Sequence, residues 1–384
     1  MRLFFSTWLA LSSFLAAWPA PGLQAADEPR PWRLLSWASP IGPQSLAFES
    51  LEGLKAMTAF LNANGGLDGR RLELRHLDLD DGQPDFQARL AALVEQVRPD
   101  LIVGGVSDVQ AGRTADFFRR LATPWFGPWS GSSGPYRGLP DDPIGLMPTA
   151  EQQLELLFDL VLSRLGPGAE ICFFVSPSSQ TTVAAAAQAA ATRGLVLEVV
   201  EVAAGFNDWA SLAQPATGRG AVVLWIPPGP AAAVLRTLKP KLSGETLWLA
   251  NAMLPPCQEL DGLTGGTWAG VIFPATLAPK TPDLRPYDAY DAVLRKYGPP
   301  GLSQDYQSYL GLAQGQILAR VLQATAKADG GRLGDALRAG FQAVAAEGTL
   351  LTASGFAVGL PPDGSFYLAQ ALRRWEWRPL APQP

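Results

Sequence analysis

Short apolar runs alternate with segments of helical periodicity along most of this chain, and this alternation restricts the fold more than any other feature of the sequence. The first expected strand, residues 33–37, is followed by an expected helix at 46–62. The same order recurs later, where the apolar run VVLW at 222–225 precedes a helical segment at 230–238. Strands that alternate with helices form βαβ units around a parallel sheet. The sequence therefore predicts an α/β fold.

The alternation is interrupted once, at residues 138–148, and starts again with an expected helix at 150–165. A chain of 384 residues, 47% of them hydrophobic, holds enough apolar material for two cores of ordinary size. Both observations predict two doubly wound parallel-sheet lobes. We expect the C-terminal part of the chain to complete sheets begun earlier, with a closing hairpin between Phe356 and residues 366–377.

The N-terminus has the pattern of a secretory signal, which we place at residues 1–26. Arg2 precedes an apolar stretch at 3–18 whose polar interruptions are Ser and Thr, and small residues follow at Ala25 and Ala26. This stretch is shorter than the roughly 20 residues of a spanning helix, so we expect cleavage near Ala25 or Ala26 and not a membrane anchor. The mature protein is expected in the periplasm, without a membrane-spanning segment.

The charge balance argues against nucleic acid as a partner. The chain has 30 Lys and Arg against 35 Asp and Glu, a net charge of −5, and it has no basic run to contact a phosphate backbone. Its two cysteines are far apart in sequence, and Cys172 lies in the apolar run ICFFV. A buried thiol at Cys172 and a bridge to Cys257 are both compatible with this pattern.

The sequence gives little support for catalysis. A serine hydrolase needs a base beside its nucleophile, but the single histidine, His76, lies inside an expected strand, and we find no G-x-S-x-G turn. One histidine and two distant cysteines form no recognisable zinc set. The glycine-rich turns match neither a phosphate loop nor a dinucleotide motif. We therefore expect a protein that is not an enzyme and that needs no cofactor or metal.

The most specific stretch is LEGLKAMTAFLNANGGLDGRRL, residues 51–72. A helix that ends in Asn-Gly-Gly-Leu-Asp-Gly and leads into a strand, with Gly65 or Gly66 as the left-handed cap, resembles the first lobe of periplasmic leucine/isoleucine/valine-binding proteins. The resemblance to these type I periplasmic binding proteins extends through most of the mature chain.

This resemblance implies two lobes joined by three crossings that close over a ligand. Lobe 1 would comprise residues 33–149 plus 275–352, and lobe 2 residues 150–274 plus 353–378. The implied function is the capture of a small molecule between the lobes and its delivery to an ABC permease. A periplasmic sensor that docks to a signalling partner is the alternative, which the sequence does not separate from transport.

The first implied ligand site is the corner PDLIVGGVSDVQ, where an apolar run ends at Gly104 and Gly105. In parallel α/β sheets, ligands bind beyond the carboxyl ends of the strands and beside helix N-termini. The family's amino-acid binders hold the ligand carboxylate with a serine at the position of Ser107. Capping of the following helix by Ser107 or Asp108 is an equally plausible role.

The second implied site is GPWSGSSGP, residues 127–135, where Ser130 and Ser132 correspond to the segment that faces the ligand's ammonium group. A flexible turn is the alternative interpretation.

Elsewhere the chain departs from the amino-acid binders. Asn251 follows the strand after which they carry a glutamate, and Gln180 replaces an expected tyrosine. A buried ammonium group without a carboxylate is costly, so the resemblance implies an altered specificity unless Asp108 supplies the charge. Tryptophans at strand ends suggest an apolar or aromatic ligand and are the candidate walls of the site, although each could also fill a core. These residues are Trp37, Trp129 and Trp225.

Overall fold

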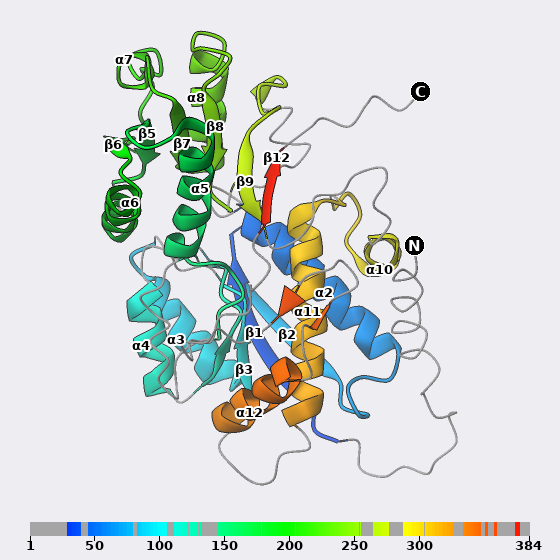
Figure 1. Cartoon of the computed structure of the whole chain (residues 1–384). Coiled ribbons are helices and arrows are strands. Elements are labelled where there is room, and N and C mark those ends of the chain that lie inside the picture. The colour runs from blue at the N-terminus through cyan, green and yellow to red at the C-terminus, as the bar shows by residue number, and fades with distance from the viewer. Residues whose placement is uncertain are drawn as a thin grey trace.

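The computed structural model has two parallel sheets flanked by helices, in two lobes that are stacked in Figure 1. It describes residues 29–39, 45–79, 83–105, 111–121, 123–129, 131, 144–177, 179–203, 205–252, 254, 264–275, 287–302, 304–325, 333–346, 350–351, 357–358 and 373–376. The predicted α/β class with two doubly wound lobes is confirmed.

The first sheet has the strand order β2-β1-β3-β4, and every pairing in it is parallel. Its strands are β1 (Trp32–Ala38), β2 (Leu72–Asp78), β3 (Leu101–Val103) and β4 (Trp125–Phe126). Helices cover both faces, because Leu34 on β1 packs in the core beneath the long helices while Leu35 packs in the core beneath the shorter pair. The long helices are α2 (Ser45–Ala63) and α11 (Tyr306–Thr325), and the shorter pair are α3 (Phe86–Val97) and α4 (Ala111–Arg120).

The second sheet has the order β12-β9-β8-β7-β5-β6. Along the chain, five of these strands come before the return to the first lobe. They are β5 (Glu170–Val175), β6 (Val196–Glu201), β7 (Ala221–Trp225), β8 (Leu247–Ala250) and β9 (Ile272–Ala275). Cys172 and Phe174 on β5 face one core and Phe173 faces the other, which explains why the strand reads as an unbroken apolar run. The helices of this part are α5 (Ala150–Leu165), α6 (Gln180–Thr192), α7 (Ala213–Ala216) and α8 (Pro228–Leu238).

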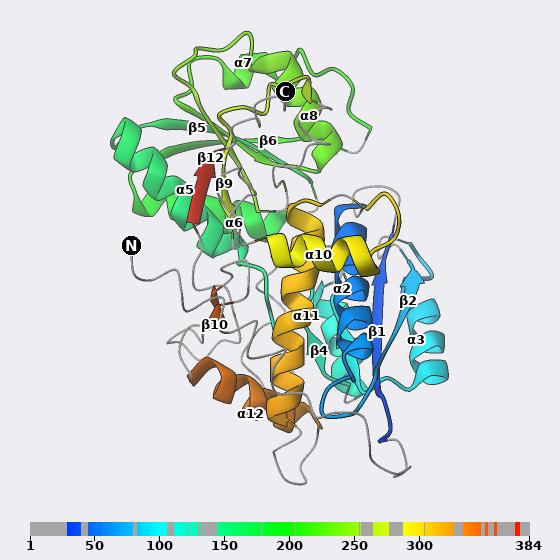
Figure 2. The same cartoon turned by 90° about the vertical axis from the view of Figure 1, so that its right-hand side faces the viewer.

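After β9 the chain returns to the first lobe. There α10 (Asp288–Tyr297) and α11 pack against α2, and α12 (Leu333–Ala346) packs against α11. In Figure 2, β12 (Arg373–Glu376) then lies beside β9 in the second lobe, to which it is paired antiparallel. The residues at which each crossing between the lobes begins and ends stay predictions.

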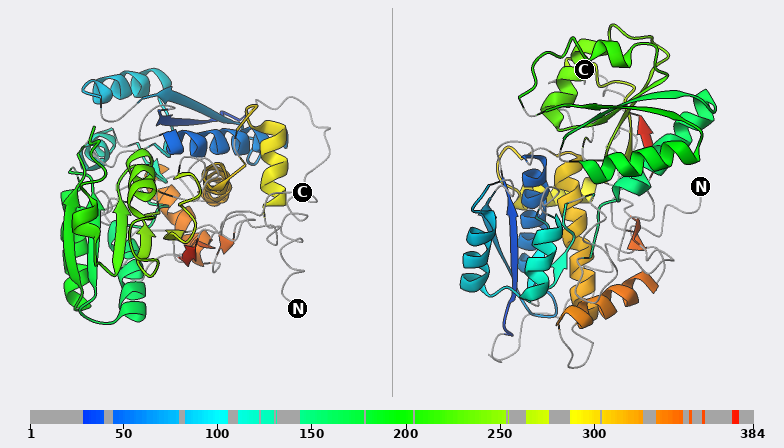
Figure 3. Two further views of the ribbon diagram at one scale, coloured as in Figure 1. Left: turned by 90° about the horizontal axis from the view of Figure 1, so that it is seen from above. Right: turned by 90° about the vertical axis from the view of Figure 1, so that its left-hand side faces the viewer.

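The contact between α2 and α11, which lie side by side in Figure 3, is unusually close. A Cβ added at Gly53 of α2 would meet the carbonyl oxygen of Ser308, and one added at Gly311 of α11 would meet that of Ser50. The Ser50 hydroxyl also donates to the backbone oxygen of Gln307 at 3.1 Å. The two helices therefore pack backbone against backbone, which only glycine permits.

Two local predictions were wrong. The described residues do not form the hairpin expected between Phe356 and residues 366–377. Instead β11 (Ala357–Val358) pairs with β10 (Leu350–Leu351), and β12 pairs with β9. The helix expected at 208–214 is reduced to α7, which starts only at Ala213. In contrast, Gly65 and Gly66 have φ values of 96° and 77°, as the left-handed cap requires.

Candidate functional site

The carboxyl ends of neighbouring strands bring the predicted site residues to one edge of each sheet. In the first lobe β3 runs into Gly104 and β4 leads to Trp129. In the second lobe Trp225 ends β7, Asn251 follows β8, and Gln180 begins the helix after β5. The arrows of β1 and β2 in Figure 2 point toward the second lobe, so this edge of the first sheet faces it.

The Gly-Gly corner after β3 is fixed by tryptophans. Gly104 and Gly105 have φ values of 66° and 78°, in the left-handed region. A Cβ at Gly104 would lie 2.7 Å from the Trp129 ring, and one at Gly105 would lie 2.5 Å from the Trp37 ring. The indole Nε1 of Trp125 donates to the carbonyl oxygen of Gly104 at 2.7 Å, and the backbone N–H of Trp129 donates to that of Gly105 at 2.8 Å. The corner is therefore a rigid element in which no other residue type fits.

Trp37 belongs to the core of the first lobe, and its predicted role as a wall is wrong. Its side chain has no exposed surface, and its ring lies 5.6 Å from Trp125 and 5.8 Å from both Phe86 and Phe118, measured between ring centroids. β1 is buried on both faces, so the ring points into the layer between the sheet and α3 and α4. Among the described residues of the site, its ring packs against Gly105.

Trp129 is 2% exposed and packs against Gly104. Within the described part of the chain its buried Nε1 has no hydrogen-bond partner. An indole N–H usually finds a partner when it is buried, so this donor is left for an acceptor outside the described residues.

In the second lobe, Trp225 and Asn251 lie at the ends of adjacent strands. Trp225 is half-buried, and its ring centroid lies 6.0 Å from that of Phe173. Asn251 is 7% exposed, and its backbone N–H donates to the carbonyl oxygen of Leu224 at 3.3 Å. Gln180 is exposed at the start of α6, two strands away from Asn251. Asn251 is thus the most buried of these three residues.

Four predicted ligand contacts, Ser107, Asp108, Ser130 and Ser132, lie outside the described residues. Their roles stay predictions. The described residues nearest to them in the sequence, Gly105 and Gly131, follow the carboxyl ends of β3 and β4.

Two buried glutamines at the same edge were not predicted from the sequence. Gln314 of α11 donates from Nε2 to the carbonyl oxygen of Gly127 at 2.7 Å, just after β4. Gln153 of α5 donates to the carbonyl oxygen of Pro148 at 2.9 Å and accepts from the N–H of Ala252 at 2.8 Å. The signal that could have found them is a polar residue on the apolar side of a predicted helix, because a buried amide needs partners.

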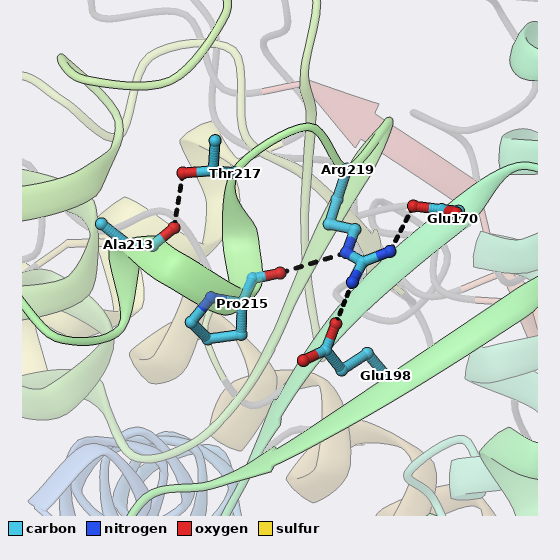
Figure 4. Close-up of polar contacts among 6 residues, drawn as sticks. All are labelled: Glu170, Glu198, Ala213, Pro215, Thr217 and Arg219. Carbon is cyan, nitrogen blue, oxygen red and sulfur yellow. Dashed lines mark hydrogen bonds and ion pairs between the residues drawn. The ribbon is translucent and has the colours of Figure 1, made fainter.

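A charged cluster occupies the opposite edge of the second sheet (Figure 4). Arg219, just before β7, forms ion pairs with Glu170 at the start of β5 and with Glu198 on β6, and its Nε donates to the carbonyl oxygen of Pro215 at 3.2 Å. The hydrogen bond to Glu170, and the charges of both glutamates, raise the pKa of Arg219. The ion pairs of this cluster stabilise the sheet by connecting β5, β6 and the start of β7. The cluster is not part of the site, because it lies at the edge opposite the carboxyl ends of the strands.

Neither the lone histidine nor the described cysteine forms a reactive centre. The His76 Nε2 lies 3.2 Å from Lys55 Nζ and 3.6 Å from Asp78 Oδ1, and burial, followed by the Lys55 charge, lowers its pKa. Cys172 is a buried free thiol whose pKa is raised by burial to about 12, while Cys257 lies outside the described residues. The described ranges contain no group of His, Cys, Asp or Glu that could hold a metal ion.

None of the helices described by the structure is long and apolar enough to cross a bilayer. The predicted secretory signal, residues 1–26, lies outside the described part of the chain.

Comparison with known proteins decides the family. A family model described as periplasmic binding protein matches residues 39–371. The chain belongs to the periplasmic binding protein family. This confirms the resemblance inferred from residues 51–72. A search of curated proteins found no match.

Solved structures of periplasmic binding proteins share the fold at low sequence identity. A branched-chain amino acid ABC transporter protein from Thermus thermophilus with bound valine is 18% identical, with a TM-score of 0.76 over 92% of this chain and 94% of that one. An R. palustris solute-binding protein in complex with 4-hydroxybenzoate is 14% identical, with a TM-score of 0.72 over 91% and 93%. A fatty acid ABC transporter substrate-binding protein from Thermomonospora curvata is 15% identical, with a TM-score of 0.71 over 89% and 86%.

Proposed function

We propose that this periplasmic binding protein captures a small apolar or aromatic molecule between its two lobes and delivers it to an ABC permease. The observation that carries the proposal is the chemistry at the carboxyl ends of β5, β7 and β8. Within the described residues, the segments that directly follow these strands contain no carboxylate, and Asn251 occupies the position after β8. An α-ammonium group placed there would find no opposite charge among the described residues, and a buried ammonium without a carboxylate is costly.

Aromatic residues after the strands of both sheets support this ligand class. Trp225 ends β7 half-buried, so it offers ring surface while Phe173 supports it from the side. Trp129 adds a buried indole N–H, which is suited to an oxygen acceptor. An aromatic or aliphatic molecule that carries an oxygen acceptor fits both features. The solved structures with 4-hydroxybenzoate and the fatty acid transporter protein indicate that this fold accommodates such ligands.

Native mass spectrometry of protein purified from the periplasm, followed by denaturation, would identify any bound molecule. Melting temperatures measured with L-leucine, 4-hydroxybenzoate and octanoate would then test the class directly. We expect 4-hydroxybenzoate or octanoate to raise the melting temperature and leucine to have no effect. Leucine binding at least as tight as that of the other two compounds would overturn the proposed ligand class.

A pair of tryptophan variants locates the site. Trp225→Leu is expected to weaken binding of the aromatic ligand by about fivefold, since one aromatic contact contributes roughly 1 kcal/mol beyond its area. Trp209→Leu is the matched control, because Trp209 is also partly buried but packs against Phe206 in the segment between β6 and α7. Equal affinities of the two variants would remove Trp225 from the site.

A further inference from the structure

The side chain of Gln153 joins two segments that are far apart in the sequence. It lies in the first turn of α5 and is 2% exposed. Its Nε2 donates to the carbonyl oxygen of Pro148 at 2.9 Å, and its Oε1 accepts from the backbone N–H of Ala252 at 2.8 Å. Pro148 lies on the path from the first sheet to the second, and Ala252 follows β8. One buried amide therefore connects the entrance of the second lobe to the end of β8.

Residues on either side of this entrance are held by different lobes. The helix that carries Gln153 packs in the core of the second lobe, where Leu154 and Leu157 lie among residues of β5, β7 and β8. Ile144 belongs to the first lobe, because its N–H donates to the carbonyl oxygen of Trp125 at 2.9 Å and its own carbonyl accepts from Gly127 at 2.7 Å. Only residues 145–147 lie between the two sets of bonds.

We propose that Gln153 is a positioning residue of the hinge: it makes Pro148 and the Asn251–Ala252 turn move as one unit with the second lobe, and so confines rotation of this crossing to residues 145–147. The inference rests on the proposed function in one respect, since it assumes that the lobes rotate to admit a ligand. Its consequence is that Asn251 keeps its place relative to α5 in the open and closed states. The binding surface of the second lobe is then formed before the ligand arrives.

A second backbone contact shows where the rotation acts. The N–H of Ala150, at the start of α5, donates to the carbonyl oxygen of Gly131 at 2.9 Å. Gly131 follows β4, so this bond runs from the second lobe to a segment attached to the first. Rotation about residues 145–147 strains this bond but leaves the bond between Gln153 and Ala252 intact. We therefore expect slower hydrogen exchange at the Ala252 amide than at the Ala150 amide.

The test uses the full chain without ligand. Spin labels attached through Ala88→Cys and Ala184→Cys, at exposed positions on α3 and α6, report the distance between the lobes in a Cys257→Ser background. The remaining thiol, Cys172, is buried. Gln153→Met removes both hydrogen bonds, and Gln153→Glu keeps the acceptor for Ala252 but loses the donor to Pro148. Gln188→Met, on the exposed face of α6, is the matched control.

We expect Gln153→Met to broaden the distance distribution and to raise the exchange rate at Ala252 about tenfold, as for the loss of one buried hydrogen bond. Gln153→Glu should broaden the distribution less and leave Ala252 protected. The proposal is overturned if the distribution of Gln153→Met matches that of Gln188→Met while Ala252 exchanges faster. If Gln153→Met does not fold, the width of the distance distribution of Gln153→Glu is compared with that of Gln188→Met instead. Equal widths then overturn the proposal. Because no ligand is involved, these outcomes are independent of whether the proposed ligand class is correct.

Discussion

Substitution of Gly311 by alanine tests whether the backbone contact between α2 and α11 holds the first lobe together. The added Cβ would lie 1.8 Å from the carbonyl oxygen of Ser50, where ordinary contact begins at 3.4 Å. The helices must therefore separate by about 1.6 Å, because a backbone oxygen cannot rotate away as a side chain can. A gap of 0.5–1 Å already loses about a quarter to a half of the dispersion energy of the atoms it separates.

The expected net loss of stability is about 3 kcal/mol. Alanine gains roughly 1 kcal/mol of helix propensity over glycine, and this gain is outweighed by overpacking and by the weaker dispersion attraction between the separated helices. Urea unfolding followed by far-UV circular dichroism measures the change. Gly334→Ala in α12 is the control, because a Cβ there meets no atom within 4 Å, and it should leave stability equal or slightly higher.

A double variant distinguishes a backbone clash from a side-chain clash. If the clash is with the backbone of Ser50, removing its hydroxyl in Ser50→Ala cannot relieve it, and the double variant should be less stable than Gly311→Ala alone. Wild-type stability of Gly311→Ala, or its rescue by Ser50→Ala, would refute the close packing of these helices.

Four further predictions can be tested by measuring stability, reactivity or binding, and they concern Gly105, Cys172, His76 and Arg219. Gly105→Ala should lose about 2–4 kcal/mol, because alanine is strained at a φ of 78° and its Cβ would overlap the Trp37 ring; urea unfolding checks this. Cys172, with its pKa raised to about 12, should not react with a disulfide reagent at pH 8 until urea unfolds the protein, and rapid labelling of the native state would contradict its burial. The pKa of His76 is lower in the folded than in the unfolded state, so protonation favours unfolding and stability should fall as the pH drops from about 7 to 5; His76→Asn should show a smaller fall in urea midpoint over that range. Arg219→Ala should cost about 1 kcal/mol or less, since both of its partners are partly exposed to solvent, and should leave ligand affinity unchanged in calorimetry.

Most of the fold could be predicted because its central strands are buried on both faces and separated by helices. The run at β5 is apolar at every residue from Ile171 to Val175, and such a run bounded by turns has few alternatives to a central parallel strand. The prediction of a closing hairpin was wrong because the pairing of β12 depends on a distant part of the chain. β12 has four residues, and its partner β9 lies about a hundred residues earlier in the chain, so no local pattern identifies the pairing.

The candidate site could be predicted to the level of strand ends but not of individual side chains. A tryptophan in a strand that is buried on both faces has two equivalent environments, and the sequence does not indicate which layer receives Trp37. Gln153 was missed because its partners, Pro148 and Ala252, are backbone groups, which carry no sequence signal. The Gly-Gly corner was found because left-handed backbone strongly selects glycine.

The pairing of β12 with β9 has a consequence for how the protein is made. Synthesis delivers β9 long before residues 373–376, so a growing chain holds β9 with one edge unsatisfied while the first lobe receives its last helices. An open strand edge is a template for wrong pairing with other chains. Neither lobe can therefore complete its fold separately from the other. A chain that stays unfolded until its synthesis is complete does not pass through an intermediate with a free β9 edge. Fragments that stop before β12 are therefore expected to aggregate on release more than the full chain, in which β12 covers the free edge of β9.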